Sequence, residues 1–197
     1  SYYKPYKAVF LKDMFFAMLS ALIALTIPLV VRYVTSTVIY METDKAWNMI
    51  LLITVSMTIL VLIQAYCNYY IANYGHVMGA RMEYDMRRDI FAHYQKLSFS
   101  FYDNQKVGQL MSRITSDLFD ITELLHHGPE NIVISVIKIA GAFIILFNIS
   151  GYLTLAAFIL VPLMLIYAYF FNKRMKAAFR QNRIKIADIN AQIEDNL

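Results

Sequence analysis

The sequence predicts an all-α membrane protein in which four long transmembrane helices continue beyond the bilayer on one side. Three stretches, residues 14–31, 46–80 and 139–172, contain no Asp, Glu, Lys or Arg. A helix needs roughly 17–25 mainly apolar residues to cross the hydrocarbon core of a bilayer, so each stretch is long enough to span it. Only 16% of the 197 residues are charged, compared with about 25% in soluble domains. These observations exclude a disordered chain, a collagen-like repeat and a water-soluble enzyme.

The chain begins with a segment, residues 1–12, that mixes aromatic residues with lysines. Such a composition is typical of an element that lies at the level of the lipid headgroups. The first spanning helix follows at residues 13–41, with its apolar part at 14–40. We therefore expect residues 1–12 to form an interfacial elbow before the chain enters the bilayer.

The remaining spans are expected at residues 47–72, 131–148 and 153–171. Residues 41–45 and 148–152 connect consecutive spans, and the second connection contains the turn-forming residues Asn148, Ser150 and Gly151. Short connections make neighbouring helices antiparallel. Spans one and two should therefore form one hairpin, and spans three and four another.

The basic residues are distributed very unevenly along this arrangement. Of the 18 Lys and Arg residues, 15 lie before span one, between spans two and three, or after span four. The positive-inside rule therefore places both ends of this segment and residues 73–130 in the cytoplasm, with the protein in the plasma membrane. This topology and the charge of the lipids account for the net charge of +4. The expected partner is the lipid bilayer, and no nucleic acid is needed.

No proline or turn cluster interrupts residues 46–97, which predicts one helix of about 52 residues, roughly 78 Å long. The hydrocarbon core accounts for about 30 Å of that length, so the rest extends into the cytoplasm. Two further helices, at residues 107–148 and 152–197, should have similar extensions. A short element at 98–106 joins the helix at 46–97 to the helix at 107–148. Each extension has an apolar stripe at helical spacing. The stripes are Met82, Met86, Ile90, Tyr94 and Leu97, then Leu110, Ile114, Leu118, Ile121 and Leu125, and finally Met175, Phe179, Ile186 and Ile189.

The short connecting element and the helix start after it contain the most specific motif of the chain. An aromatic pair with an acidic residue is followed by a glycine, then by Ser-Arg, and then by an aspartate four positions after the arginine. The residues are Phe101-Tyr102-Asp103, Gly108, Ser112-Arg113 and Asp117. This pattern resembles the first intracellular loop of ATP-binding cassette (ABC) exporters, and the resemblance extends over nearly the whole chain.

The resemblance implies the ABC exporter transmembrane fold and a transporter driven by ATP hydrolysis in attached cytosolic domains. Such a transporter moves a hydrophobic or amphipathic substrate, such as a drug, lipid or peptide, by alternating access. It implies a nucleotide-binding domain that holds ATP and Mg, and a second transmembrane subunit that makes a homodimer or a heterodimer. By the same resemblance, the coupling element that contacts the nucleotide-binding domain includes Phe99, Phe101, Tyr102 and Asp103. Gly108, Arg113 and Asp117 belong to the start of the following helix.

The sequence also departs from that family's pattern. ABC exporters have six spans per transmembrane domain, whereas four are predicted here, and no phosphate-binding G-x-x-x-x-G-K-[ST] motif occurs. We therefore expect an incomplete transmembrane domain, without catalytic residues or a cofactor of its own, from an ATP-hydrolysing parent. The alternative is a stand-alone four-span scaffold or small ion-coupled carrier without an ATPase.

Two basic residues lie within predicted spans, where charge is costly and therefore often functional. Lys138 is expected near the middle of the bilayer. It could contact an anionic part of a substrate, or form a structural ion pair, for example with Glu130. Arg32 lies nearer the outer interface, where its side chain could extend to the headgroups. Lys138 and Arg32 are the candidate residues of the substrate path.

A group of acidic residues and histidines precedes span three on one side of a predicted helix. Its members are Glu123, His126, His127 and Glu130. Glu-x-x-His occurs in metal sites of four-helix bundles, but those sites take matching acids from other helices, and no second Glu-x-x-His occurs here. Pro129 should also kink the helix and break the spacing. Because His76 and His93 lack neighbours at ligand spacing, we expect a hydrated polar stretch and no metal site.

Gly75 and Gly79 form a G-x-x-x-G pattern, which lets two helix backbones approach closely. A contact within one helix bundle and a contact between two subunits both explain this pattern. The sequence does not choose between them.

Overall fold

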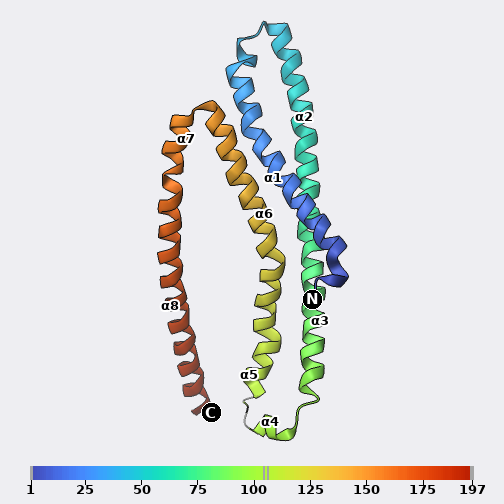
Figure 1. Cartoon of the computed structure of the whole chain (residues 1–197), viewed down its shortest axis with the longest axis vertical. Helices are drawn as coiled ribbons and strands as arrows, with labels where there is room; N and C mark the ends of the chain where they lie inside the picture. Colours follow the sequence, from blue (N-terminus) through green and yellow to red (C-terminus); the bar gives the residue numbers. More distant parts are fainter. Residues whose placement is uncertain (1, 104, 106, 196–197) are drawn as a thin grey trace. The chain divides into compact units, whose positions relative to one another are not determined.

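The computed structural model describes residues 2–103, 105 and 107–195 and is almost entirely helical over them, without a β-strand in these ranges. Figure 1 shows the helices coloured along the sequence. The chain divides into two compact units, Ser1–Ala142 and Phe143–Leu197. The elements of the first unit are η1 (Lys4–Tyr6), α1 (Lys7–Ser36), η2 (Val38–Tyr40), α2 (Thr43–Tyr70), η3 (Ile71–Gly75), α3 (His76–Tyr94), α4 (Phe99–Asp103), α5 (Val107–Ser112), η4 (Arg113–Asp117) and most of α6 (Leu118–Ile149). The end of α6, α7 (Gly151–Phe158) and α8 (Leu160–Asp195) form the second unit.

The four long helices expected from the sequence are confirmed. Four helical stretches are long and apolar enough to cross a membrane: Lys4–Tyr40, Thr43–Tyr94, Leu110–Ile149 and Gly151–Ile186. The second runs without a break through α2, η3 and α3 for 52 residues, which corresponds to a rod of roughly 78 Å. The chain is thus a multi-pass membrane protein.

Small side chains bring α1 and α2 together in the first hairpin. Ala17 and Ala21 on α1 are almost completely buried, and a row of small residues lets two helix backbones come close where lipid provides no hydrophobic drive. Polar contacts cross the same interface, since the Ser20 hydroxyl donates to the Asn68 side-chain oxygen at 2.8 Å. The Gln64 amide donates to the Ser20 carbonyl at 3.5 Å. Helix association here therefore rests on close packing and hydrogen bonds.

Beyond this hairpin, a methionine-rich core joins α3 to the beginning of α6. Met78, Met82 and Met86, spaced by four residues along α3, are buried together with Leu118. The predicted apolar stripe therefore begins one turn earlier than expected, at Met78. Ile121 was expected in the opposing stripe, but its side chain is 49% exposed. Within α6 the buried residues follow a four-residue spacing from Leu118 to Thr122 and His126, so Ile121 lies beside the buried face.

The N-terminal segment packs onto the same core through its tyrosines. The Tyr3 hydroxyl donates to the Leu125 carbonyl on α6 at 2.6 Å, and the Tyr6 hydroxyl donates to Asp85 on α3 at 2.8 Å. Burial raises the pKa of the Tyr3 phenol, so this hydroxyl remains a hydrogen-bond donor. Residues 2–6 consequently connect the start of α1 to both α3 and α6.

In the second unit, α7 begins at a serine cap and is followed by an interruption. The Ser150 hydroxyl oxygen accepts a hydrogen bond from the Leu153 amide at 3.4 Å, and the Phe143 and Phe158 rings meet edge to face at 4.8 Å. One helix was expected over 152–197, but α7 ends at Phe158. Pro162 explains the interruption because it has no N–H to donate to the carbonyl four residues earlier.

The last predicted stripe lies on α8. Met175, Phe179 and Ile186 are exposed, and the side chain of Ile189 lies outside the described residues.

Replacing Ala21 with leucine should disrupt the α1–α2 hairpin. The added side chain has no room at a position that is 1% exposed, and overpacking of this kind costs about 1–3 kcal/mol. We expect Ala21→Leu to lower the Tm of the detergent-purified full-length protein. Ala65→Leu, the same change at an exposed position of α2, is the control. Equal Tm values for the two variants would contradict close packing at Ala21.

Candidate functional site

The first candidate site is the short helix α4 at the turn between α3 and α5. Phe99 is 90% exposed, while Phe101 and Tyr102 are partly buried and Asp103 is exposed. The Tyr102 hydroxyl donates to the Tyr94 carbonyl at the end of α3, at 2.6 Å. Tyr102 therefore fastens the tip to α3, and Phe99 is the exposed aromatic side chain of α4.

The helix start after the tip also presents its motif residues to the surface. Gly108 is exposed, and a Cβ added there would meet no atom within 4 Å. Nothing in the described part of this chain therefore requires glycine at this position. Arg113 and Asp117, at the two ends of η4, line an open depression together with Asp89 and His93 of α3. Ile90, Leu118 and Ile121 add apolar side chains to its lining.

The two basic residues of the spans are exposed in this chain. Lys138 on α6 and Arg32 on α1 both point away from the packed interior. The ion pairs formed by the described residues do not include one between Lys138 and Glu130. Instead, Glu130 is buried and its carboxylate contacts His127 Nδ1 at 3.2 Å. The structural pairing considered for Lys138 is thus replaced by a Glu130–His127 contact.

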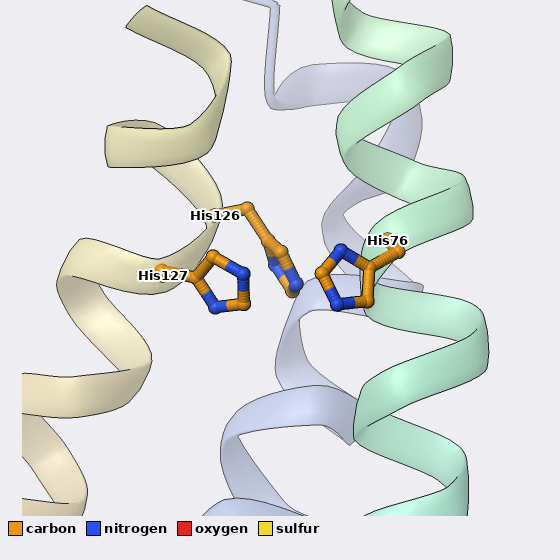
Figure 2. A group of neighbouring side chains, drawn as sticks. All are labelled: His76, His126 and His127. Atoms are coloured by element: carbon orange, nitrogen blue, oxygen red, sulfur yellow. The ribbon is translucent and has the colours of Figure 1, made fainter. Parts of the chain in front are cut away.

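The second candidate site is a buried cluster where α1, α3 and α6 meet. Asp13 of α1 is 0% exposed and His126 of α6 is 2% exposed, with 3.9 Å between Asp13 Oδ2 and His126 Nδ1. His76, the first residue of α3, brings its ring to 5.3 Å from that of His126 and 4.9 Å from that of His127. Figure 2 shows the His76 and His127 rings directed toward His126, which lies between them.

Gly75 makes this meeting of helices possible. A Cβ at Gly75 would overlap the His126 ring and would lie 2.8 Å from its Nε2 and 3.0 Å from Asp13 Oδ1. Gly79 faces the same histidine, but a Cβ there would lie at an ordinary 3.7 Å from His126 Cβ. Gly75 therefore serves a close contact within this chain, and Gly79 is not required for it.

Sequence reasoning found part of this cluster and missed the rest. The expectation that Pro129 would break the spacing of the α6 residues is wrong, because α6 continues from Leu118 to Ile149 and both Glu123 and Glu130 contact His127. Asp13 and His76 were not associated with the group, since they come from other helices. The signals available were a carboxylate at the edge of an uncharged run and a histidine beside Gly75.

Comparison with known proteins gives a family match and several relatives. The model of the ABC transporter transmembrane region matches residues 10–197. The uncharacterized ABC transporter ATP-binding protein YwjA of Bacillus subtilis (strain 168) is 40% identical over 197 residues, covering 100% of this chain and 34% of YwjA. YgaD of the same organism, provisionally named a multidrug export ATP-binding/permease protein, is 24% identical, with 98% and 34% covered. A Staphylococcus aureus (strain NCTC 8325 / PS 47) protein with the same provisional description is 27% identical, with 98% and 34% covered. The chain thus spans about a third of the length of these relatives.

Replacing Gly75 with alanine should separate α6 from η3 because the new methyl group occupies the space of the His126 ring. We expect Gly75→Ala to destabilise the full-length protein by about 1–3 kcal/mol, measured as a lower Tm in detergent. The matched control is Gly79→Ala, whose Cβ has room and whose helix propensity improves by up to about 1 kcal/mol. A Gly75→Ala variant as stable as Gly79→Ala would refute the close approach.

Proposed function

The chain belongs to the family of ABC transporter transmembrane regions, and on that premise we propose that it forms the transmembrane part of an ATP-driven exporter. Its substrate is hydrophobic or amphipathic, such as a drug, a lipid or a peptide, and crosses the plasma membrane by alternating access. The names of the relatives, which include ATP binding and multidrug export, support this proposal. Family membership favours it over a stand-alone four-span scaffold or ion-coupled carrier.

In this proposal, the basic ends of the helices lie in the cytoplasm. The 15 basic residues that flank the spans on one side support that orientation. ATP and Mg bind to a nucleotide-binding domain outside these 197 residues, and a second transmembrane subunit, identical or different, completes the path. The exposed apolar faces of α2 and α8 leave ample surface for lipid and for that subunit.

The observation that carries the proposal is the exposed aromatic tip at the end of a long continuous helix. Phe99 is 90% exposed on α4, which follows the 52-residue helix Thr43–Tyr94. An exposed aromatic ring at such a distance from the spanning part has no lipid to enter, and aromatic residues are enriched at protein interfaces, which favours a partner site here. We propose that Phe99 fills a groove on the nucleotide-binding domain, with Phe101 and Asp103 beside it.

The internal contacts of the tip explain how a movement of that partner reaches the membrane. The Tyr102 hydroxyl holds α4 to the Tyr94 carbonyl, at the end of α3, through its 2.6 Å hydrogen bond. Arg87 Nε of α3 donates to the Ile114 carbonyl of η4 at 3.3 Å. α3 is consequently linked both to α4 and to η4. A push on α4 is transmitted to two helices that continue into the spans.

Phe99→Ala in the complete transporter should uncouple hydrolysis from transport. Loss of an aromatic anchor costs roughly 2 kcal/mol or more, about 30-fold in the affinity of an interface. We expect near-normal ATP binding, a large loss of transport in proteoliposomes, and ATP hydrolysis that no longer responds to substrate.

Phe91→Ala is the matched control, because Phe91 is an exposed aromatic of α3 away from the tip. Tyr102→Phe separates the internal role of Tyr102 from docking, since it removes the hydrogen bond to Tyr94 but keeps the ring. Normal transport by Phe99→Ala with substrate-stimulated hydrolysis would exclude the docking role.

Lys138 offers a test of the substrate path. Its side chain is exposed and lacks an ion-pair partner among the described residues, which suits a contact with an anionic substrate group. Lys138→Met should change which compounds stimulate ATP hydrolysis while expression and Tm stay near the parent values. Arg32→Met, at the other basic residue of the spans, provides the comparison. An unchanged stimulation profile in Lys138→Met would remove Lys138 from the path.

A further inference from the structure

Three imidazole rings from two helices converge at the junction of α1, α3 and α6 (Figure 2). The ring centres of His76, His126 and His127 lie 5.3, 4.9 and 4.5 Å apart. One nitrogen from each ring lies within 4.8 Å of one nitrogen of the others. In a tetrahedral site with metal–nitrogen distances of about 2.0–2.1 Å, two coordinated imidazole centres lie about 5 Å apart. The observed separations match that value.

The buried members of the junction lack partners for their polar atoms. Both carboxylate oxygens of Asp13 and both ring nitrogens of His126 are buried without a hydrogen bond, and 3.9 Å between Asp13 Oδ2 and His126 Nδ1 is too long for one. Burial of unpaired polar groups is costly, and of an unpaired charge more so. A cation held by the rings would satisfy His126 directly and give Asp13 a charge to face.

We propose that His76, His126 and His127 bind a divalent transition-metal cation, with Asp13 and Glu130 as supporting carboxylates. The two carboxylates would balance the charge of a divalent ion on three neutral imidazoles. The ligand atoms of Asp13, His126 and Glu130 also lie within 4.8 Å of one another. Both carboxylates therefore lie close to His126.

The carboxylates also fix which ring nitrogen faces the cation. A metal-binding histidine usually donates its other ring N–H to a carboxylate or carbonyl group, which sets the tautomer. Glu130 Oε2 lies 3.2 Å from His127 Nδ1, and Asp13 Oδ2 is the carboxylate atom facing His126 Nδ1. Nε2 of His127 is then its metal ligand. Glu123 Oε2 also lies near the site, 3.5 Å from His127 Nε2.

The ligand types select the class of cation. Imidazole nitrogens favour Zn²⁺ and neighbouring first-row metals, whereas Mg²⁺ and Ca²⁺ prefer sites made of oxygen atoms. Cys67, the only cysteine of the sequence, is not part of the cluster, so a thiolate site for Cu(I) is not indicated. The proposed site is therefore a zinc-type site that joins α3 to α6 and faces α1.

The test is metal binding by the full-length protein, purified in detergent with a non-histidine affinity tag and treated with a chelator. Co²⁺ and Zn²⁺ are titrated, with the visible absorption of bound Co²⁺ and the Tm as readouts. We expect one Co²⁺ per chain with the absorption of tetrahedral nitrogen coordination, and a rise in Tm with Zn²⁺. The measurement involves neither ATP nor transport, so its outcome is independent of the exporter proposal.

His76→Ala is the decisive variant because His76 is exposed and its loss leaves the buried packing in place. We expect affinity for Co²⁺ to fall at least about tenfold and the Zn²⁺-dependent rise in Tm to disappear. His93→Ala removes an exposed histidine of the same helix outside the cluster, and it should bind as the parent does. Asp13→Asn should weaken binding without removing the nitrogen coordination. Equal Co²⁺ affinity in the parent and His76→Ala, or no binding by the parent, would overturn the proposal.

Discussion

The hydrocarbon core of a bilayer offers no hydrogen-bond partner to the peptide backbone, and this constraint determines most of the structure. Each backbone group must be satisfied within its own segment, so the spanning parts of the chain are helices. Lipid also provides no hydrophobic drive between helices, so these must associate by close packing and polar contacts. Ala17, Ala21 and the Ser20–Asn68 hydrogen bond meet that requirement in the first hairpin. The helices remain long because nothing at the membrane boundary ends them.

The same constraint makes the junction of Asp13, His76 and His126 unusual. Buried ionisable groups beside the apolar spans are costly, and the protein brings them together by removing side-chain volume at Gly75. The Met78–Leu118 core on one side and the Ser20–Asn68 contact on the other hold the surrounding helices in place. The polar cluster therefore lies between two packed regions, where a movement of one helix would displace the other two.

Much of the fold follows from the sequence because it depends on local properties. Uncharged runs identify the spans, and the absence of proline from 46–97 predicts the long helix that is observed over Thr43–Tyr94. The predicted break from helical spacing at Pro129 did not occur because a helix inside a bundle tolerates proline better than an isolated one. Pro162 did interrupt a helix, although the sequence analysis expected one continuous helix over residues 152–197.

The two candidate sites were predictable to different degrees, because one depends on local sequence and the other on packing. The tip motif is contiguous, so the sequence identifies it, but only the Tyr102–Tyr94 hydrogen bond distinguishes the internal aromatic from the exposed Phe99. The histidine junction combines residues from three helices, and no pattern along the chain relates Asp13 or His76 to His126. Such proximity is a property of packing, which depends on the exact rotation of each helix.

That rotation is set in part by η3, the π-helical stretch Ile71–Gly75. Each residue of an α-helix advances the side-chain direction by about 100°, and a π-helical turn accommodates one more residue than an α-helical turn. The stretch thus changes the rotational offset between α2 and α3, which bury Cys67 and Tyr70 before it and Met78 and Met82 after it. α2 and α3 can consequently pack against different neighbours, although they belong to one continuous helix. A single-residue deletion in η3 would therefore rotate the side chains of α3 about the helix axis by about 100° relative to those of α2.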